Sequence, residues 1–321
     1  MPIWNDVTAE GVLTAELAII ERLRTRLAGP EGQTWIGDDA AVVPGPSGAL
    51  LLAADAVVAG VHADLGLVGL DDLGWKALVV NVSDVAAMGG RPTHALATVA
   101  GPLDGLDVDL LYDGLTAAAE AYGCPVVGGD LSSAPTLVVA VAVVGDGEPA
   151  EPPPVLRSGA RPGDTVLTTG PLGSSAAGLA LLRAGRAGEA PDLATAHCRP
   201  RARLAEGGVA RAAGATAMID VSDGLALDVR RLADASHVGV VLEHVPVAIG
   251  VSRVSDDPEA VALGGGEDYE LVFTAPDPDR VDAAFAEAGL ALPLRIGRCT
   301  ADPAERRLRD GDLPALGYRH G

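Results

Sequence analysis

The sequence predicts an α+β protein built from two domains. Stretches typical of strands and of helices mix in both halves of the chain, without a strict βαβ alternation. The chain has 321 residues, 48% of them hydrophobic, which is enough to form a sizeable core in each of two domains. A segment rich in Pro and Gly, DGEPAEPPPVLRSGARPGD, is typical of a domain boundary. We therefore expect one domain over residues 1–148 and a second over 149–321.

The first half opens with an amphipathic segment. Apolar residues at helical spacing predict a helix over residues 14–29, with Thr14 as N-cap and Gly29 at its end. A Gly-Asp-Asp turn follows, and then a buried strand. The elements expected after the turn are a strand from 49 that ends at Asp55, a helix from about 71 to 90, a strand at 93–102, a helix at 107–123, a strand at 125–130 running into a glycine turn, and a strand at 136–145.

The second half shows the same mixture of elements. Strands are expected at 165–170 and 238–247, in AMIDVSDG at 217–224, which leaves a strand for a turn, and in GGGEDYELVFTAP at 264–276, where a glycine turn leads into a strand. Helices are expected at 174–185, 197–214, 225–236 and 279–290.

Composition narrows the classes of partner. Acidic residues outnumber basic ones 44 to 23, for a net charge of −21, which argues against nucleic acid and against an anionic membrane surface as partners. Three widely spaced cysteines form no metal or disulfide pattern and favour a reducing compartment. With no signal peptide and no membrane-spanning stretch in the sequence, we expect a cytoplasmic protein.

Acidic residues recur where strands or turns end, or where an apolar run would favour no charge. Burying a lone carboxylate is costly, so several of them indicate a shared cation such as Mg²⁺. Lys76 is the only lysine, so phosphates would have to be bound by metal ions and by backbone N–H groups of glycine turns. The residues concerned are Asp39, Asp55, Asp84, Asp130, Asp220, Asp223, Glu267 and Asp268.

Each of these residues also has a simpler interpretation. Asp84 could face solvent, Asp130 could lie in a hairpin turn, and Asp223 could cap the following helix. His62 would ordinarily be a partly exposed histidine, and Tyr318 a packing residue. The chain has no GxxxxGK[ST] loop and no HRD or DFG pair, so ATP would have to be bound by another route.

Seven motifs in order resemble the thiamine-monophosphate kinase family, which belongs to the superfamily of aminoimidazole ribonucleotide synthetase. The resemblance covers nearly the whole chain and implies the two-domain architecture of that superfamily, with mixed sheets and flanking helices in each domain. The motifs are IGDDAAVV, NVSDVAAMGG-RP, VVGGD, RSGARPGD, GPLGSSAAGLALL, MIDVSDGLALDV and GGGEDYELVF.

The resemblance implies an activity and a set of site residues. Family members transfer the γ-phosphate of ATP to thiamine monophosphate in line, with several Mg²⁺ ions, and are homodimers that pair through their N-terminal sheets. Matching positions imply Mg²⁺ ligands at Asp39, Asp55, Asp84, Asp130, Asp220 and Asp223, with Asp130 and Asp223 catalytic. They imply ATP contacts at Tyr112, Gly129, Asp130, Arg157 and Ser222, and thiamine-substrate contacts at His62, Glu267 and Tyr318.

Departures from the family pattern leave two alternatives open. Ala63 replaces a usual Phe, which raises a kinase for another small phosphate ester. Ala53 and Ala54 stand where Ser or Thr is usual before Asp55, which raises a catalytically weak nucleotide-binding homologue. Leu131 also replaces a usual Thr after the GGD motif.

Overall fold

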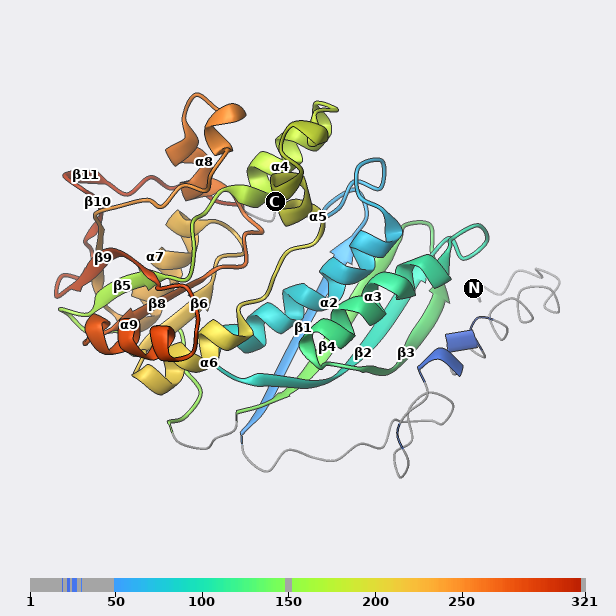
Figure 1. Ribbon diagram of the computed structural model, residues 1–321, viewed down its shortest axis with the longest axis horizontal. Helices are drawn as coiled ribbons and strands as arrows, with labels where there is room; N and C mark the ends of the chain where they lie inside the picture. The colour runs from blue at the N-terminus through green and yellow to red at the C-terminus, as the bar shows by residue number, and fades with distance from the viewer. Residues whose placement is uncertain are drawn as a thin grey trace, which may run out of the picture.

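The computed structural model describes residues 49–147 and 152–318, together with residues 19, 22, 23, 25–27 and 30 near the N-terminus. In this part of the chain two sheets lie side by side, each with helices packed against it (Figure 1). The predicted α+β class is therefore confirmed. Residues 19, 22, 23, 25 and 26 are helical, as the N-terminal pattern predicts. No helix in the described ranges combines the length and apolar character needed to span a bilayer.

The N-terminal sheet has the order β1-β4-β2-β3 among the described strands. β2 and β3 are parallel, whereas β4 pairs antiparallel with both β1 and β2. Burial alternates along β4, where Val139, Val141 and Val143 are buried and their neighbours are not, so one sheet face is covered. The strands are β1 Leu50–Val58, β2 Arg91–Gly101, β3 Val126–Ser133 and β4 Val138–Asp146.

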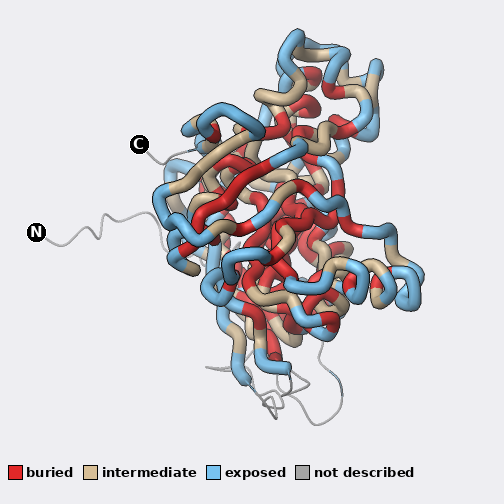
Figure 2. Tube along the Cα trace, turned by 90° about the vertical axis from the view of Figure 1, so that its left-hand side faces the viewer, coloured by how far each residue is buried: buried red, intermediate tan, exposed pale blue. Residues whose placement is uncertain are grey.

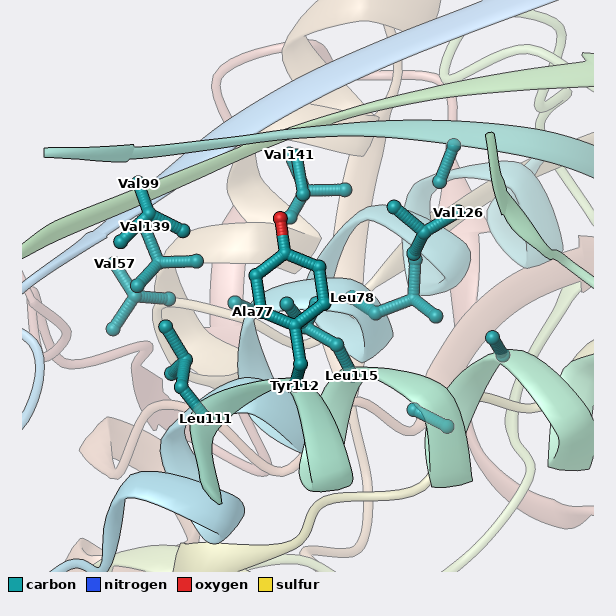
Figure 3. Packing of buried hydrophobic residues seen from close by; sticks show 14 of the residues in the cluster. Val57, Ala77, Leu78, Val99, Leu111, Tyr112, Leu115, Val126, Val139 and Val141 are labelled. Atoms are coloured by element: carbon teal, nitrogen blue, oxygen red, sulfur yellow. The ribbon is translucent and has the colours of Figure 1, made fainter. Parts of the chain in front are cut away.

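Two helices, α2 (Leu70–Ala87) and α3 (Val108–Tyr122), pack against each other and cover that face. Glycines let their backbones approach closely, since a Cβ on Gly74 would lie only 2.0 Å from the carbonyl oxygen of Leu111. Figure 3 shows the side chains of α3 pointing at valines of the sheet, with Tyr112 in the middle of this core. We call the sheet face opposite these helices the open face.

The C-terminal sheet has the order β11-β10-β7-β9-β5-β8-β6 among the described strands. β8 is buried along its whole length because it separates two cores. Val272 packs into the core formed with α7 (Leu225–Ser236), and Phe273 stacks against Phe285 of α9 (Pro278–Glu287) on the other side. The strands are β5 Thr165–Thr168, β6 Ala217–Asp220, β7 Gly239–Leu242, β8 Leu271–Ala275, β9 Leu294–Thr300, β10 Arg306–Leu308 and β11 Gly311–Asp312.

Helices of the second domain surround this sheet, so that buried residues gather in the interior and exposed ones at the periphery (Figure 2). The helices are α4 Ser174–Arg183, α5 Pro191–Cys198, α6 Leu204–Ala213, α7 Leu225–Ser236, α8 Pro258–Gly264 and α9 Pro278–Glu287, with 3₁₀ turns at Ala187–Glu189 and Val251–Arg253. α2 is buried nearly all round because it also contacts α5, α6 and β6 of this domain.

Four sequence expectations are wrong in detail. The strand expected to end at Asp55 runs on to Val58. The single helix expected at 197–214 is two helices, because Pro200 interrupts it between Cys198 and Leu204. The strand expected at 238–247 is short and ends at Leu242. The glycine turn expected after 125–130 is instead part of strand β3, in which a Cβ on Gly129 would lie 1.8 Å from the carbonyl oxygen of Ala97.

Candidate active site

Three of the predicted carboxylates, Asp55, Asp84 and Asp220, act on one another where the two domains meet. Asp55 lies on β1, Asp84 on α2 and Asp220 at the end of β6. The pKa of Asp84 is raised to about 7, chiefly by burial and then by the charges of Asp220 and Asp55. Like charges disfavour ionisation only when they are close, so the fold brings these carboxylates together.

Hydrogen bonds fix two of these acids in place. The hydroxyl of Ser83 donates to Oδ2 of Asp220 at 2.7 Å, linking α2 to β6 across the domains. Asp220 is only 4% exposed, and burial raises its pKa. The backbone N–H of Asp55 donates to Oδ1 of Asn81 at 2.8 Å, which ties β1 to α2. One helix therefore positions acids from both sheets.

Arg157 faces the same acids. Its positive charge lowers the pKa of both Asp84 and Asp220, against the larger effect of burial. Arg157 lies in the segment that connects the two sheets, so the predicted ATP contact comes to the same place as the predicted metal ligands.

The donor chemistry of this cluster fits a hard cation such as Mg²⁺. Carboxylate oxygens are its usual protein ligands, and Mg²⁺ commonly takes only one or two of them and completes its shell with water and phosphate. Within the described residues no group of three or more His, Cys, Asp or Glu side chains is arranged to hold a metal. The acids therefore suit sharing ions with a phosphate ligand rather than forming a closed protein cage.

Asp223 follows on the loop after β6 and does not cap the next helix. α7 begins after Gly224 without a side-chain cap, and Asp228 instead reaches back to accept hydrogen bonds from the backbone N–H groups of Asp223 and Gly224 at 3.0 and 3.1 Å. The carboxylate of Asp223 pairs with Arg231 at 2.5 Å. The simple capping interpretation of Asp223 is therefore wrong.

The loop at 221–223 also anchors two predicted substrate residues. The backbone N–H of Glu267 donates to the carbonyl oxygen of Ser222 at 2.8 Å, and that of Tyr318 donates to the carbonyl oxygen of Asp223 at 2.9 Å. Glu267 has a φ of 64°, a left-handed conformation that is rare for residues other than Gly, Asn and Asp. Such strain concentrates at functional sites, and here it aims one side chain of the glycine-rich loop.

Two further residues of the site escaped the sequence reasoning. Lys76, fully buried on α2, places its Nζ 3.1 and 3.2 Å from the two carboxylate oxygens of Glu267. His197 of α5 lies with Nδ1 3.5 Å from Oε2 of Glu267 and 3.0 Å from the hydroxyl of Ser175. The available signal was a lone lysine in an otherwise apolar stretch of helix.

Asp130 and Gly129 lie away from these acids. Asp130 pairs with Thr98 of β2, which pairs with Ala140 of β4, and its side chain therefore belongs to the open face of the sheet. Among the described strands, β3 and β1 lie at the two edges of this sheet, so Asp130 and Asp55 are separated by three strand spacings, about 14 Å. Ligands of one Mg²⁺ ion lie within about 4 Å of each other, so these two cannot share an ion within one protomer.

Tyr112 and His62, which are predicted to contact ATP and the thiamine substrate, lie in different surroundings. Tyr112 is 3% exposed in the N-terminal core, and burial raises its pKa to about 12. Nδ1 of His62 accepts a hydrogen bond from the backbone N–H of Val58 at 3.1 Å. The roles of Tyr112 in ATP binding and of His62 in substrate binding stay predictions. Asp39 lies outside the described residues.

A cavity of about 540 Å³ lies next to the segment that follows the glycine-rich loop, since Asp268 and Glu270 border it. Trp75, Arg199, Arg203 and Glu270 are among the residues that line it, together with Asp268, one of the acids singled out from the sequence. Asp268 itself accepts hydrogen bonds from the N–H groups of Gly173 and Ser175 and so holds the start of α4. This cavity is a neighbour of the acidic cluster and not part of it.

Two known domain families match this chain, one in each half. Residues 37–146 match the AIR synthase related protein N-terminal domain, and residues 161–309 match its C-terminal domain. The thiamine-monophosphate kinase of Halobacterium salinarum is 42% identical over 253 residues, which cover 77% of this chain and 83% of the relative.

Solved structures show the same likeness. The thiamine-monophosphate kinase from Stenotrophomonas maltophilia superposes with a TM-score of 0.81 at 31% identity, covering 94% of this chain and 98% of the other. AaThiL complexed with AMPPCP and TMP superposes with a TM-score of 0.76 at 32% identity, covering the whole of both chains at 100%.

Proposed function

Since this chain belongs to the thiamine-monophosphate kinase family, we propose that it transfers the γ-phosphate of ATP to thiamine monophosphate, giving thiamine diphosphate and ADP. The observation that carries the proposal is the gathering of Asp55, Asp84 and Asp220 from both domains at one place. The complex of AaThiL with AMPPCP and TMP supports the choice of the two substrates.

The proposed reaction is a direct in-line transfer. Two anionic phosphates must approach each other, so the site has to position them and offset their charge. Mg²⁺ held by Asp55, Asp84, Asp220 and Asp223 would supply that charge, with Asp39 as a further proposed ligand. Arg157 adds a fixed positive charge beside the same acids. Ser222, whose carbonyl oxygen holds Glu267, would keep the nucleotide side and the thiamine side of the site in register.

On the thiamine side we assign Glu267, Tyr318 and His62. Glu267 and Tyr318 are tied by backbone hydrogen bonds to the loop that carries Asp223, so an acceptor bound to them lies next to the acids. Ala63, the departure that raised another acceptor, is buried in the N-terminal core, and its small side chain therefore acts on packing there. This observation leaves thiamine monophosphate as the favoured acceptor.

We further propose that Asp130 of a second copy of the chain completes the site. Leu50, Leu52 and Leu96 are 52%, 71% and 44% exposed on the open face, which forms an apolar surface suited to pairing two sheets. Asp130 and Gly129 lie on that same sheet, too far from Asp55 to share an ion within one protomer. In a homodimer built through the open face, they would act on the ATP and Mg²⁺ of the partner's site.

A cytoplasmic location completes the proposal. All three cysteines are free and buried, as suits a reducing compartment.

The test is an assay of the purified protein with ATP, Mg²⁺ and thiamine monophosphate, in which ADP and thiamine diphosphate are both measured. We expect the two products in equal amounts. Formation of ADP only with a different phosphate ester as acceptor would show a related kinase instead. Nucleotide binding without turnover of any acceptor would show a weak nucleotide-binding homologue.

A further inference from the structure

Lys76 carries a positive charge at a buried position whose neighbours on the helix are apolar. It is the only lysine of the chain and is 0% exposed on α2, where its neighbours Ala77 and Leu73 belong to the N-terminal core. A buried ammonium group is strongly unfavourable without a partner, and replacing buried ion pairs by apolar residues is often neutral or stabilising. The stability of the helix therefore gives no reason for a lysine at this position.

The partner of Lys76 is a residue held in a strained conformation. Nζ of Lys76 contacts both carboxylate oxygens of Glu267, at 3.1 and 3.2 Å. Glu267 keeps the left-handed backbone described above, after Gly266, where a Cβ would lie 2.6 Å from the carbonyl oxygen of Ser222. A buried cation and a strained backbone thus converge on one carboxylate, whose side chain remains 28% exposed.

The neighbouring groups do not take over this task. His197 lies 3.5 Å from Oε2 of Glu267, but burial and the nearby Lys76 and Arg183 charges lower its pKa to about 3, so it is neutral at physiological pH. Its Nδ1 lies 3.0 Å from the hydroxyl of Ser175, which fixes the ring. Lys76 is therefore the cation that orients the carboxylate of Glu267, and the uncharged His197 ring lies beside that carboxylate.

α2 carries Lys76 and Asp84 on one rigid element. They are eight residues apart, about 12 Å along the helix, and their positions differ by about 80° around its axis. The helix therefore sets the distance between Glu267 at one end and the acidic cluster at the other. A substrate with a basic ring at one end and a phosphate at the other can span such an arrangement.

Resting on the proposed function, we propose that Lys76 is a positioning residue that aims the carboxylate of Glu267 at the hydrogen-bond-donating aminopyrimidine ring of thiamine monophosphate. It acts through Glu267 and does not touch the phosphates. Its loss should weaken binding of the thiamine substrate and leave ATP binding nearly unchanged.

The test measures equilibrium binding by calorimetry, separately for thiamine monophosphate and for ATP with Mg²⁺. Lys76→Met removes the charge at similar length. We expect its affinity for thiamine monophosphate to fall roughly ten- to a hundredfold, the range for losing a hydrogen bond to a charged group, with ATP affinity within about twofold. Lys76→Arg, which keeps the charge, should recover part of the loss.

A matched control separates positioning from general stability. Arg203 pairs with the buried Glu270 three residues further along the same segment, so Arg203→Met also breaks a buried ion pair. It should leave the affinity for thiamine monophosphate unchanged. Equal losses for both ligands in Lys76→Met, no loss at all, or the same loss in Arg203→Met would overturn the positioning role.

A second comparison keeps the test valid if Lys76→Met unfolds. The double variant Lys76→Met with Glu267→Gln leaves no unpaired charge, and it should bind thiamine monophosphate as Glu267→Gln alone does. A further loss in the double variant would show that Lys76 acts independently of Glu267, against the proposal. If the wild-type protein binds ATP but not thiamine monophosphate, it is the proposed function that fails.

Discussion

At the scale of single residues, the buried carboxyl of Asp84 makes the stability of the folded protein depend on pH. Its carboxyl is buried near Asp55 and Asp220, and its pKa is raised to about 7 from an ordinary 3.8. The folded chain therefore binds a proton at Asp84 more tightly than the unfolded chain does. The resulting stabilisation is complete only below the unfolded pKa, and is lost as the pH rises from about 4 to about 7.

Asp84→Asn should remove this loss in the metal-free protein. At pH 8 in EDTA we expect the variant to melt above the wild type, by on the order of a few degrees, and the gap should narrow toward pH 5. Thermal melting followed by circular dichroism across this pH range measures both. Asp312→Asn, at an exposed position on β11, serves as the control and should not shift. A variant that melts below the wild type at pH 8 contradicts the account.

At the scale of elements, α2 is the piece on which the site depends. It packs on the N-terminal sheet and α3, reaches β6 and α6, and carries Lys76, Asn81, Ser83 and Asp84. Its tight packing requires Gly74, whose missing side chain lets the carbonyl of Leu111 approach. A helix in such close contact can hold side chains from both domains in fixed positions.

Gly74→Ala should therefore destabilise the protein by about 1–3 kcal/mol, because the new methyl group would overlap the backbone of α3. Gly208→Ala is the matched control, a glycine on α6 with nothing within 4 Å of an added Cβ. It should be neutral or stabilising by up to about 1 kcal/mol. Urea unfolding of both variants measures the difference, and equal effects would refute the close-packing argument.

The sequence predicts most elements of this fold because their patterns are local. The apolar run of α2 and its Gly-Gly end, and the alternation along β4, needed no knowledge of the rest of the chain. The short strand β7 was missed because tertiary packing, not periodicity, decides where it stops, whereas the split at Pro200 has a local signal, the proline itself. The strand through Gly128 and Gly129 was missed because glycine pairs usually mark turns, whereas here they allow a close approach to Ala97.

The candidate site shows the same limit. That Asp55, Asp84 and Asp220 converge follows from the way the domains pack, which no spacing along the chain encodes. The family resemblance supplied the residue names but not the partner of Glu267, since Lys76 is distant from it in sequence and is no part of a motif. Likewise, only the register of the sheet separates Asp130 from Asp55.

At the scale of the whole molecule, the proposed site needs two copies of the chain. Asp130 would serve the acids of the partner through the open face, so each dimer would contain two composite sites. A variant in Asp130 and a variant in Asp220 would then each inactivate a different half of the same site.

Co-expression of Asp130→Asn with Asp220→Asn tests this arrangement. Each variant alone should lose about a hundredfold or more in rate. In mixed dimers one of the two sites keeps both aspartates, so random pairing should restore about a quarter of wild-type activity. If both aspartates serve the same protomer, the mixture stays as inactive as the separate variants, and the composite site is wrong. Light scattering confirms that dimers form.

The most direct test of the central claim is the initial rate of thiamine diphosphate formation as Mg²⁺ is raised from zero, at saturating ATP and thiamine monophosphate. We predict no product in EDTA, a rate that rises with Mg²⁺ in the wild type, and a rate at least about a hundredfold lower in folded Asp220→Asn. Product formation in EDTA, or equal rates for wild type and Asp220→Asn, would contradict an interdomain carboxylate site that works through Mg²⁺.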